Sequence, residues 1–430
     1  MGFWEAFRYW LKLGFINFGG PSGQIALMHK ALVEEKRWLS EERFLHALNY
    51  CMLLPGPEAQ QLAIYIGWLL HRIVGGIVAG VFFVLPSVFI LLALSWIYAV
   101  HGNISWVAGL FYGLKPAVVA VVAEAVIRIG KKTLKNSILL GLAAGAFTAI
   151  YVYQVPFPVI VLAAGVIGFA GNQMLPGRLS FSSDALNSAK EGLSATAISD
   201  DDPPQEHTRP KWSRLFKVVV ACLSVWWTPI ILLGAVRGWD DIFVREGIFF
   251  SKAAMVTFGG AYSVLAYLAQ QAVHRYGWIR PEQMLDGLGL AETTPGPLII
   301  VTQFVGFMGA FNHPHGFDPV MAGIMGGLVS TWATFAPCFL WIFVGAPFIE
   351  YLRGNRHLTG ILTSITAAVV GVMLNLAVFF TQHALLPTGG PDWFGIALAI
   401  TAFLVLRCWH WGMPAVIGSA VTLGLLWKVV

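Results

Sequence analysis

Charged residues are scarce in this sequence, and their scarcity excludes a soluble protein. Only 11% of the 430 residues are charged and 57% are hydrophobic, whereas soluble domains average about 25% charged residues. Residues 73–100 and 321–349 contain no charge, and each run exceeds the roughly 20 residues that cross a bilayer. Lipid offers no partner for backbone polar groups, so such runs must form helices. The sequence therefore predicts an all-α polytopic membrane protein.

Signatures of cofactor and nucleotide chemistry are also missing. The four cysteines lie far apart, without the spacing of a metal site. The sequence has no Walker motif and no zinc-protease motif, and the stretch that starts at Asp286 resembles a dinucleotide loop only loosely. No nucleophile, metal set or acid–base pair is brought together by the pattern. We therefore expect no cofactor, no metal and no enzyme activity.

The small net positive charge does not indicate a nucleic-acid partner. The formal net charge is +5, and the basic residues lie in loops that flank apolar runs, as membrane topology requires. The first eight residues lack the regions of a cleavable signal and predict the start of an amphipathic or half-inserted helix. The expected partners are therefore the lipid bilayer and a small solute, with a homodimer as one assembly that the sequence allows.

The chain contains two copies of one sequence pattern, in which a set of motif residues recurs 240 positions later, as Phe18 does at Phe258. Two motifs and a tryptophan that share one spacing indicate an internal repeat. Beyond these the repeat continues with small gaps. The matched residues are Phe18-Gly19-Gly20 with Phe258-Gly259-Gly260, Trp38 with Trp278, Glu42 with Glu282, Pro55-Gly56-Pro57 with Pro295-Gly296-Pro297, and Leu85-Pro86-Ser87 with Ala336-Pro337-Cys338.

The repeat divides the chain into four parts. Residues 1–172 and 238–430 are the two repeats. Residues 173–214 are polar and rich in Ser, Asn and Gly, a composition that buries too little apolar surface to fold, so they form a linker. Residues 215–237 are expected to form one linking transmembrane helix.

The charges of the loops predict that the two repeats have opposite orientations. In the first repeat the loops at Arg72 and at residues 131–135 are basic, whereas in the second repeat the equivalent loops lack Lys and Arg. Basic loops face the cytoplasm, so the second copy is inverted and the linker is cytoplasmic. Arg237 and Arg245 would lie outside, an exception softened by Asp240, Asp241 and Glu246. Inverted repeats are typical of transporters, although duplication without transport is an alternative.

Two apolar segments in each repeat are interrupted, and we expect broken or re-entrant helices there. A Gly-Gly pair interrupts the first segment and Pro-Gly-Pro interrupts the second. Glycine weakens a helix, and proline ends it at the residue before. Pro57 and Pro297 should therefore lie near the first turn of a second half-helix.

These interruptions predict an anion site. The start of a half-helix exposes unpaired N–H groups and the positive end of the helix dipole, for which an anion is the natural partner inside a membrane. The alternative is that the glycines permit close packing and the prolines only kink the helices. The candidate substrate-binding residues are Asn17, Gly19, Gly20, Ser22, Gln24, Pro55, Gly56, Pro57, Gln60 and Gln61 in the first half, and Gly259, Gly260, Tyr262, Ser263, Thr293, Thr294, Pro295, Gly296, Pro297 and Gln303 in the second.

Three ionisable residues are candidates for coupling. Glu58 follows the first Pro-Gly-Pro and Glu292 precedes the second; carboxylates inside a membrane are costly and often functional. Our hypothesis is that Glu292 titrates during transport, whereas Glu58 could instead cap its half-helix. Lys115 could attract an anion or lie near the outer interface. Glu124 and Arg128 are four residues apart and should form a structural pair on one helix face.

The interrupted segments resemble those of the chromate ion transporter family, in its long two-domain form. The stretches that carry the resemblance are Phe18-Gly-Gly-Pro-Ser-Gly-Gln24, Trp38-Leu-Ser-Glu-Glu-Arg-Phe44 and Leu54-Pro-Gly-Pro-Glu-Ala-Gln-Gln-Leu-Ala63 in the first half, and Phe258-Gly-Gly-Ala-Tyr262, Trp278 and Ala291-Glu-Thr-Thr-Pro-Gly-Pro-Leu298 in the second. The resemblance covers nearly the whole chain except the linker. It implies chromate export across the bacterial inner membrane, driven by the electrochemical gradient, and hence chromate resistance.

Other functions fit parts of the same pattern. Sulfate, molybdate or another small oxyanion would satisfy the same half-helix argument, and some relatives in the family that the sequence resembles are associated with sulfate. A membrane-embedded enzyme could use buried carboxylates but would need a catalytic constellation. A passive anion channel would differ from a carrier in its lack of saturation and counter-flow.

Overall fold

All regular elements of the described chain are helices. The computed structural model describes residues 2–174, 212–258, 261–348, 356–387, 390–409 and 411–429. Within these ranges five helices are long and apolar enough to cross a membrane: Glu58–His101 (α4), Ser105–Thr133 (α5), Trp212–Arg237 (α8), Pro319–Gly345 (α13) and Gly360–Leu385, which belongs to α15 (Arg356–Leu385). The prediction of an all-α polytopic membrane protein is confirmed. The predicted linker, apart from its ends, lies outside the described residues.

The early elements of the two halves match one another in order and length. Each half begins with a helix, a break, a short helix that continues as a π-helix, a loop and a third helix. The bounds are Phe3–Ile16 (α1), Gly20–His29 (α2), Lys30–Glu35 (η1) and Glu41–Cys51 (α3) in the first half, and Ile242–Val256 (α9), Ala261–Leu268 (α10), Ala269–Arg275 (η4) and Pro281–Thr293 (α11) in the second.

The later elements match as well. The backbone of α4 is not helical at His71 and Arg72, so α4 consists of two helical segments, which correspond to α12 and α13 of the second half. The single helix α8 (Trp212–Arg237) joins the halves and has no counterpart among the described elements; it begins before the expected start at residue 215 and ends at the expected residue. The remaining bounds are Ser137–Tyr151 (α6), Phe157–Met174 (α7), Leu298–Ile300 (η5), Val301–Asn312 (α12), Ala346–Phe348 (η6), Trp393–Cys408 (α16) and Met413–Val429 (α17).

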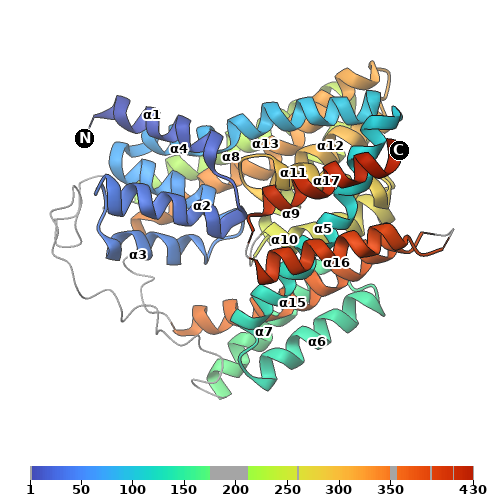
Figure 1. The fold of residues 1–430 in the computed structure, drawn as a ribbon. Coiled ribbons are helices and arrows are strands. Elements are labelled where there is room, and N and C mark those ends of the chain that lie inside the picture. Colours follow the sequence, from blue (N-terminus) through green and yellow to red (C-terminus); the bar gives the residue numbers. More distant parts are fainter. Residues whose placement is uncertain are drawn as a thin grey trace.

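The two halves pack against each other reciprocally. Helices α6 and α7 of the first half lie on α15 of the second, and α16 and α17 of the second half lie on α5 of the first (Figure 1). In the same way α1 packs on α4 and α9 packs on α13. The repeat seen in the sequence is therefore also a repeat of packing. The opposite orientation of the halves in the membrane stays a prediction.

Pairs of glycines allow two helix crossings, one in each half, to be very close. In the first half Gly67 faces Gly75, and in the second Gly306 faces Gly326; a β-carbon on any of the four would collide with the backbone carbonyl of its partner. Small residues at a crossing allow two backbones to approach closely, which is how helices associate in lipid. Each half thus holds its interrupted segment tightly against the following transmembrane helix.

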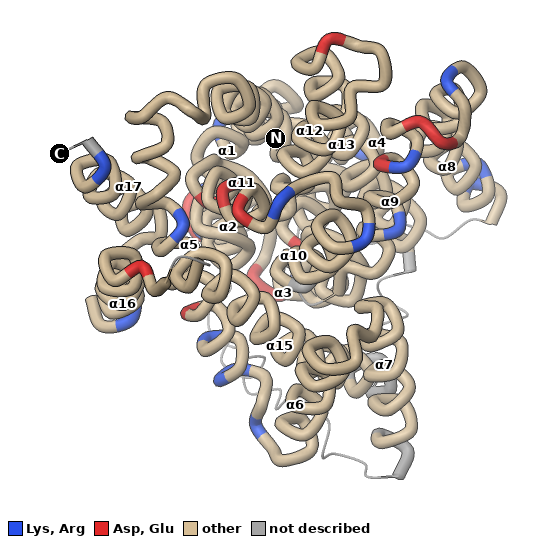
Figure 2. The backbone as a smooth tube through the Cα atoms, turned by 90° about the vertical axis from the view of Figure 1, so that its right-hand side faces the viewer, with Lys and Arg blue, Asp and Glu red and all other residues tan. Residues whose placement is uncertain are grey.

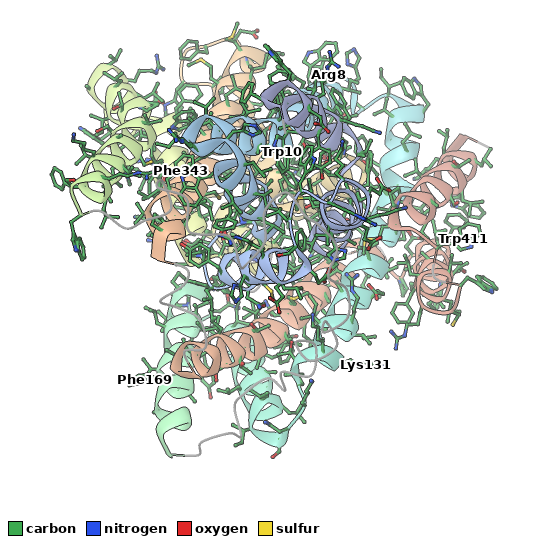
Figure 3. The ribbon with its side chains drawn as sticks, turned by 90° about the vertical axis from the view of Figure 1, so that its left-hand side faces the viewer. Arg8, Trp10, Lys131, Phe169, Phe343 and Trp411 are labelled. Atoms are coloured by element: carbon green, nitrogen blue, oxygen red, sulfur yellow. The ribbon has the colours of Figure 1, made fainter. Side chains whose placement is uncertain are left out.

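The outer surface is apolar, as a bilayer requires. Figure 2 shows that Lys, Arg, Asp and Glu occupy few segments of the backbone. Figure 3 shows Trp411 at the rim and Phe169 near the end of α7, and these side chains are 53% and 45% exposed, whereas Trp10 is buried. Exposed tryptophans near helix ends fit the interfacial belt of a membrane protein.

Candidate functional site

The structure contains all four breaks that the sequence predicts. Helix α1 ends at Ile16 and α2 begins at Gly20, while α9 ends at Val256 and α10 begins at Ala261. At the Pro-Gly-Pro motifs, α3 is separated from α4 and α11 from η5, and Pro57 and Pro297 directly precede the new helices. The sequence correctly located these interruptions because proline and glycine act locally on the backbone.

The breaks are joined to one another across the two halves. The N–H of Gly296 donates to the carbonyl of Asn17 at 3.1 Å, and the N–H of Gly56 donates to the carbonyl of Thr257 at 2.8 Å. Thr257 is the repeat counterpart of Asn17, as Gly296 is of Gly56. Each Pro-Gly-Pro break therefore meets the Gly-Gly break of the opposite half, and the two junctions are equivalent.

Only glycine fits at the centre of each Pro-Gly-Pro motif. Gly56 and Gly296 have φ angles of +119° and +109°, a region that L-residues with a side chain rarely enter. A β-carbon at Gly296 would overlap the Ser87 hydroxyl, and one at Gly56 would lie 3.2 Å from Cys338 Sγ. Ser87 and Cys338 are themselves repeat counterparts, so each junction also receives one residue from a long transmembrane helix.

Polar side chains satisfy the backbone groups that the breaks leave unpaired. Gln24 Nε2 donates to the carbonyls of Asn17 and Gly296, at 3.0 and 2.5 Å. Ser87 Oγ donates to the carbonyl of Pro295 at 2.5 Å, and Gln61 Nε2 donates to that of Pro55 at 2.7 Å. Unsatisfied backbone groups are expensive in a membrane interior, so these residues stabilise the interrupted conformation.

Several amide side chains at the junctions have unused hydrogen-bonding atoms. The buried atoms Asn17 Oδ1, Gln24 Oε1, Gln60 Oε1 and Gln61 Oε1 have no hydrogen-bond partner in the described part of the chain. Buried polar groups are nearly always paired, so such exceptions need an explanation. In each of these side chains the amide nitrogen donates to a backbone carbonyl, whereas the amide oxygen is left without a partner.

The remaining candidates differ in position. Gln303 Nε2 donates to the carbonyl of Val88 on α4, and its Oε1 accepts from Thr331 on α13, so it links long helices. Thr293 and Thr294 donate to carbonyls in the last turn of their own helix. Gly19 and Gly20 have positive φ and turn the chain into α2, whereas Ser22 is exposed. Gly259, Gly260 and the side chain of Ser263 lie outside the described residues.

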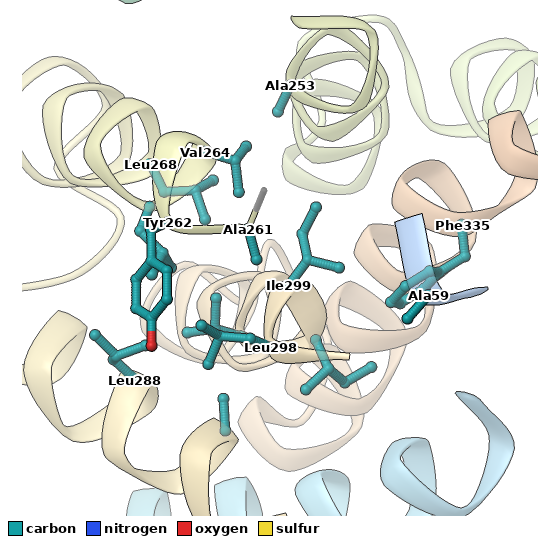
Figure 4. Packing of buried hydrophobic residues seen from close by; sticks show 14 of the residues in the cluster. Ala59, Ala253, Ala261, Tyr262, Val264, Leu268, Leu288, Leu298, Ile299 and Phe335 are labelled. Atoms are coloured by element: carbon teal, nitrogen blue, oxygen red, sulfur yellow. The ribbon is translucent and has the colours of Figure 1, made fainter. Parts of the chain in front are cut away.

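The two carboxylates beside the Pro-Gly-Pro motifs have different surroundings. Glu292 is buried and its Oε1 accepts a hydrogen bond of 2.8 Å from the Tyr262 hydroxyl; Figure 4 shows this ring projecting from α10 towards α11, where Leu288 is labelled. Glu58 lies in the first turn of α4, as expected for a helix cap, and its Oε2 has no hydrogen-bond partner in the described chain. The second half thus places a phenol–carboxyl pair between its two breaks.

Lys115 faces a carboxylate that the sequence interpretation overlooked. Its Nζ lies 3.7 Å from Asp286 Oδ2, which also accepts a 2.9 Å hydrogen bond from the Tyr98 hydroxyl. The sequence analysis connects Asp286 only with a loose resemblance to a dinucleotide-binding loop. An aspartate in an apolar segment is itself a signal of function, and it could have identified this residue. The expected pair on α5 is confirmed, with Arg128 Nε 3.5 Å from Glu124 Oε2.

The charged residues of α5 and α11 line the contact between the two halves. Helices α5 and α11 pack together, and Figure 2 shows basic and acidic segments beside each other there. We call Lys115, Glu124, Arg128, Asp286 and Glu292 the α5–α11 charged strip. Charges of this kind inside a membrane protein usually face the bundle interior or a pathway.

Comparisons with known proteins give the family. The chain is 28% identical over 425 residues to a chromate transport protein of Cupriavidus metallidurans, covering 97% of this chain and 91% of that protein. It is 29% identical over 408 residues to a chromate transport protein of Pseudomonas aeruginosa, covering 93% and 87%. An uncharacterized transporter of Methanocaldococcus jannaschii is 26% identical over 405 residues, covering 93% and 88%. No solved structure matches the chain.

These relatives are named as transport proteins or transporters, which confirms the expectation that the chain is not an enzyme. The family model described as chromate transporter matches residues 4–169 and 246–425. The two matched parts lie within the two repeats and include all four breaks, whereas residues 170–245, which contain the linker and α8, fall outside together with the chain ends. The chain therefore belongs to the chromate transporter family.

Proposed function

We propose that this protein exports chromate across the bacterial inner membrane and binds the oxyanion where the four breaks meet. The observation that carries the proposal is the pair of reciprocal backbone bonds, Gly296 to Asn17 and Gly56 to Thr257. They bring four interrupted helices into two matching junctions. The similarity to two chromate transport proteins over most of the chain supports chromate as the substrate.

The chemistry of the junctions suits a dianion that must also be released. The helices that begin at Gly20, Glu58 and Leu298 start beside the breaks, and each helix start offers N–H groups and the positive end of a dipole. The nearby side chains are mostly neutral amides and hydroxyls, whose donors bond backbone carbonyls in this conformation and would turn to the anion when it binds. Neutral donors hold an oxyanion less firmly than arginine pairs would, which favours turnover over tight binding.

The cross-half bonds also suggest how access could alternate. Each junction takes one break from each half, so a movement of one half against the other changes both junctions together. In transporters built from inverted repeats, rocking of the repeats opens a central site first to one side and then to the other. We infer that movement of the two halves at these junctions opens the binding site first to one side of the membrane and then to the other.

Energetics favour export. Moving one charge across the membrane potential is worth about 2.3 kcal/mol per 100 mV, so a dianion gains roughly 4.6 kcal/mol when it leaves a cell that is negative inside. The potential alone can drive this movement. Coupling to the proton gradient would be an addition and not a necessity.

The test is chromate uptake into everted membrane vesicles that contain the full-length protein. We expect saturable uptake that needs energised vesicles, stops when the potential is collapsed and is inhibited by excess sulfate. Vesicles without the protein are the control. Uptake no greater than in the control would overturn the chromate proposal.

Sulfate is the second candidate, because its charge and shape resemble those of chromate and the same junction chemistry applies. If chromate uptake is absent, sulfate uptake into right-side-out vesicles decides between a sulfate carrier and another function. A saturable flux with counter-flow would distinguish a carrier from a passive anion channel.

A further inference from the structure

One buried carboxyl has no role in the site described above. Glu246 on α9 is 0% exposed, and neither Oε1 nor Oε2 has a hydrogen-bond partner in the described part of the chain. An isolated carboxylate in an apolar interior is so costly that the group takes up a proton instead. The expectation that Glu246 would offset the nearby arginines is wrong, because Arg237 pairs with Asp241 and Arg245 pairs with Asp240.

The space around this carboxyl is made by two glycines. A β-carbon at Gly309 on α12 would lie 2.6 Å from Glu246 Oε1, and one at Gly326 on α13 would lie 2.8 Å from Oε2. The carboxyl therefore fills the crossing of α9, α12 and α13.

The first half builds the corresponding crossing without a carboxyl. Ala6 occupies the position that matches Glu246 at the repeat offset, and it is buried where α1 packs on α4. The first half thus packs its crossing with apolar groups alone, with the larger Leu69 at the position that matches Gly309. A buried carboxyl is costly, so its presence in the second half needs a functional explanation.

Few titratable groups surround Glu246, and none described compensates its charge. Asp241 on α9 is bound to Arg237 of α8, and the exposed His313 at the end of α12 bonds the Gly309 carbonyl at 3.1 Å. Cys338 is the one titratable residue of α13, and α10 contributes Tyr262, which bonds Glu292, and Tyr267. His313 lies one turn from Gly309 and is exposed.

The helix of Glu246 also reaches a substrate junction. Helix α9 ends at Val256, and the next residue, Thr257, accepts the backbone hydrogen bond from Gly56. Because α9 leads directly into this junction, we expect a rearrangement there to displace α9 relative to α12 and α13. We propose that Glu246 is a proton-binding site of the transport cycle, protonated in the conformation described here and deprotonated when α9 moves; this inference rests on the proposed transport function.

The test uses the full-length protein in liposomes that enclose a pH-sensitive dye, with an imposed chromate gradient and a clamped potential. We expect chromate movement to be accompanied by proton movement in the wild type. In Glu246→Gln, which keeps the size of the side chain, we expect at least a tenfold lower ratio of protons to chromate while chromate flux persists. Asp240→Asn, with a side chain that is 96% exposed, is the matched control and should behave as the wild type.

The outcomes separate this inference from the proposed function. An unchanged proton-to-chromate ratio in Glu246→Gln, or wild-type chromate flux without proton movement, would overturn the inference and leave chromate transport intact. The absence of chromate flux in the wild type would overturn the proposed function instead.

A second measurement does not depend on transport. In infrared difference spectra of the purified protein between acid and alkaline pH, the wild type should lose a carboxylic-acid C=O band that Glu246→Gln lacks. If Glu246→Gln fails to fold, Glu246→Ala serves in its place, because alanine is the residue at the matching position of the first half. A wild-type band that does not change with pH, or a band that persists in the variant, counts against the inference.

Discussion

The backbone N–H of Gly296 donates a hydrogen bond to the carbonyl of Asn17, and this bond connects the two halves of the protein at their interrupted helices. Its counterpart joins Gly56 to Thr257. Neither half can complete these junctions alone, because the acceptor always belongs to the other half. The two copies are therefore one structural unit at the breaks, and a change in either Pro-Gly-Pro motif should affect both stability and transport.

The first prediction concerns Gly296→Ala. A φ of +109° strains a residue with a side chain, at a cost of roughly 1–3 kcal/mol, and the new β-carbon would overlap Ser87. We expect a lower thermal unfolding temperature in detergent and the loss of most chromate uptake. Gly56→Ala should be milder, because its nearest neighbour is the flexible end of the Gln61 side chain.

The control for these variants is Gly141→Ala on α6, where a β-carbon meets nothing within 4 Å. Alanine favours the helix over glycine, so this variant should keep wild-type uptake and an equal or higher unfolding temperature. If Gly296→Ala were as stable and active as Gly141→Ala, the junction would not be the site of tight packing that the structure describes.

The breaks could be predicted from the sequence, whereas their pairing could not. Proline and glycine act on their own backbone, so the ends of α3 and α11 were visible in the residue order alone. The bond from Gly296 to Asn17 joins residues of different halves, which meet only when the two halves pack together. The roles of Gln24 and Ser87 as donors to freed carbonyls follow from that packing, and the polar pattern indicated only that Gln24 belonged to the site.

The same reasoning explains why the sequence did not indicate a role for Asp286. Asp286 and Lys115 lie on helices of different halves, so no local spacing connects them, whereas Glu124 and Arg128 form a pair within one helix that the spacing of four residues predicts. The sequence groups Glu246 with Asp240 and Asp241, as a residue that offsets Arg237 and Arg245, because these residues are neighbours in the chain. Its burial depends on the rotation of α9 against α12 and α13.

The second prediction is a double-mutant cycle on Lys115 and Asp286. Lys115→Gln leaves a buried carboxylate with only the Tyr98 hydroxyl as partner, and breaking a buried ion pair in this way costs about 3 kcal/mol or more. Asp286→Asn should cost less, because the Lys115 side chain is 26% exposed and keeps some contact with solvent. We expect the double variant to unfold at a higher temperature than Lys115→Gln alone.

Lys12→Gln, a change at an exposed lysine of α1, is the matched control and should not alter the unfolding temperature. Additive losses in the double variant would show that Lys115 and Asp286 do not interact. Chromate uptake by each variant then tells whether the pair is structural or whether a free Lys115 attracts the anion.

The third prediction concerns Glu292, which lies between the two breaks of the second half and is hydrogen-bonded to Tyr262. A charged Glu292 would repel a dianion in the neighbouring junction, whereas a protonated one would not. We therefore expect the KM for chromate to rise with increasing pH in the wild type and to stay flat in Glu292→Gln.

Tyr262→Phe provides the discriminating control. The hydroxyl donor stabilises the ionised carboxylate, so its removal should move the rise in KM to higher pH without abolishing it. A KM that depends on pH equally in the wild type and in Glu292→Gln would remove Glu292 from the transport cycle.

The last prediction tests the opposite orientation of the two halves. Helix α8 is a single crossing between two copies that have matching elements, and one extra crossing reverses the second copy relative to the first. The loop after α5 should therefore be cytoplasmic and the equivalent loop after α15 should be external.

Cysteines introduced as Lys135→Cys and Leu386→Cys report on these loops, after the accessible Cys222 and Cys408 are replaced by serine. A membrane-impermeant maleimide should label only Leu386→Cys in spheroplasts and only Lys135→Cys in everted vesicles, while both react in solubilised membranes. Labelling of both positions from one side would mean that the halves are parallel, and the alternating-access argument built on their inversion would then have to be abandoned, although the reciprocal junctions themselves would remain.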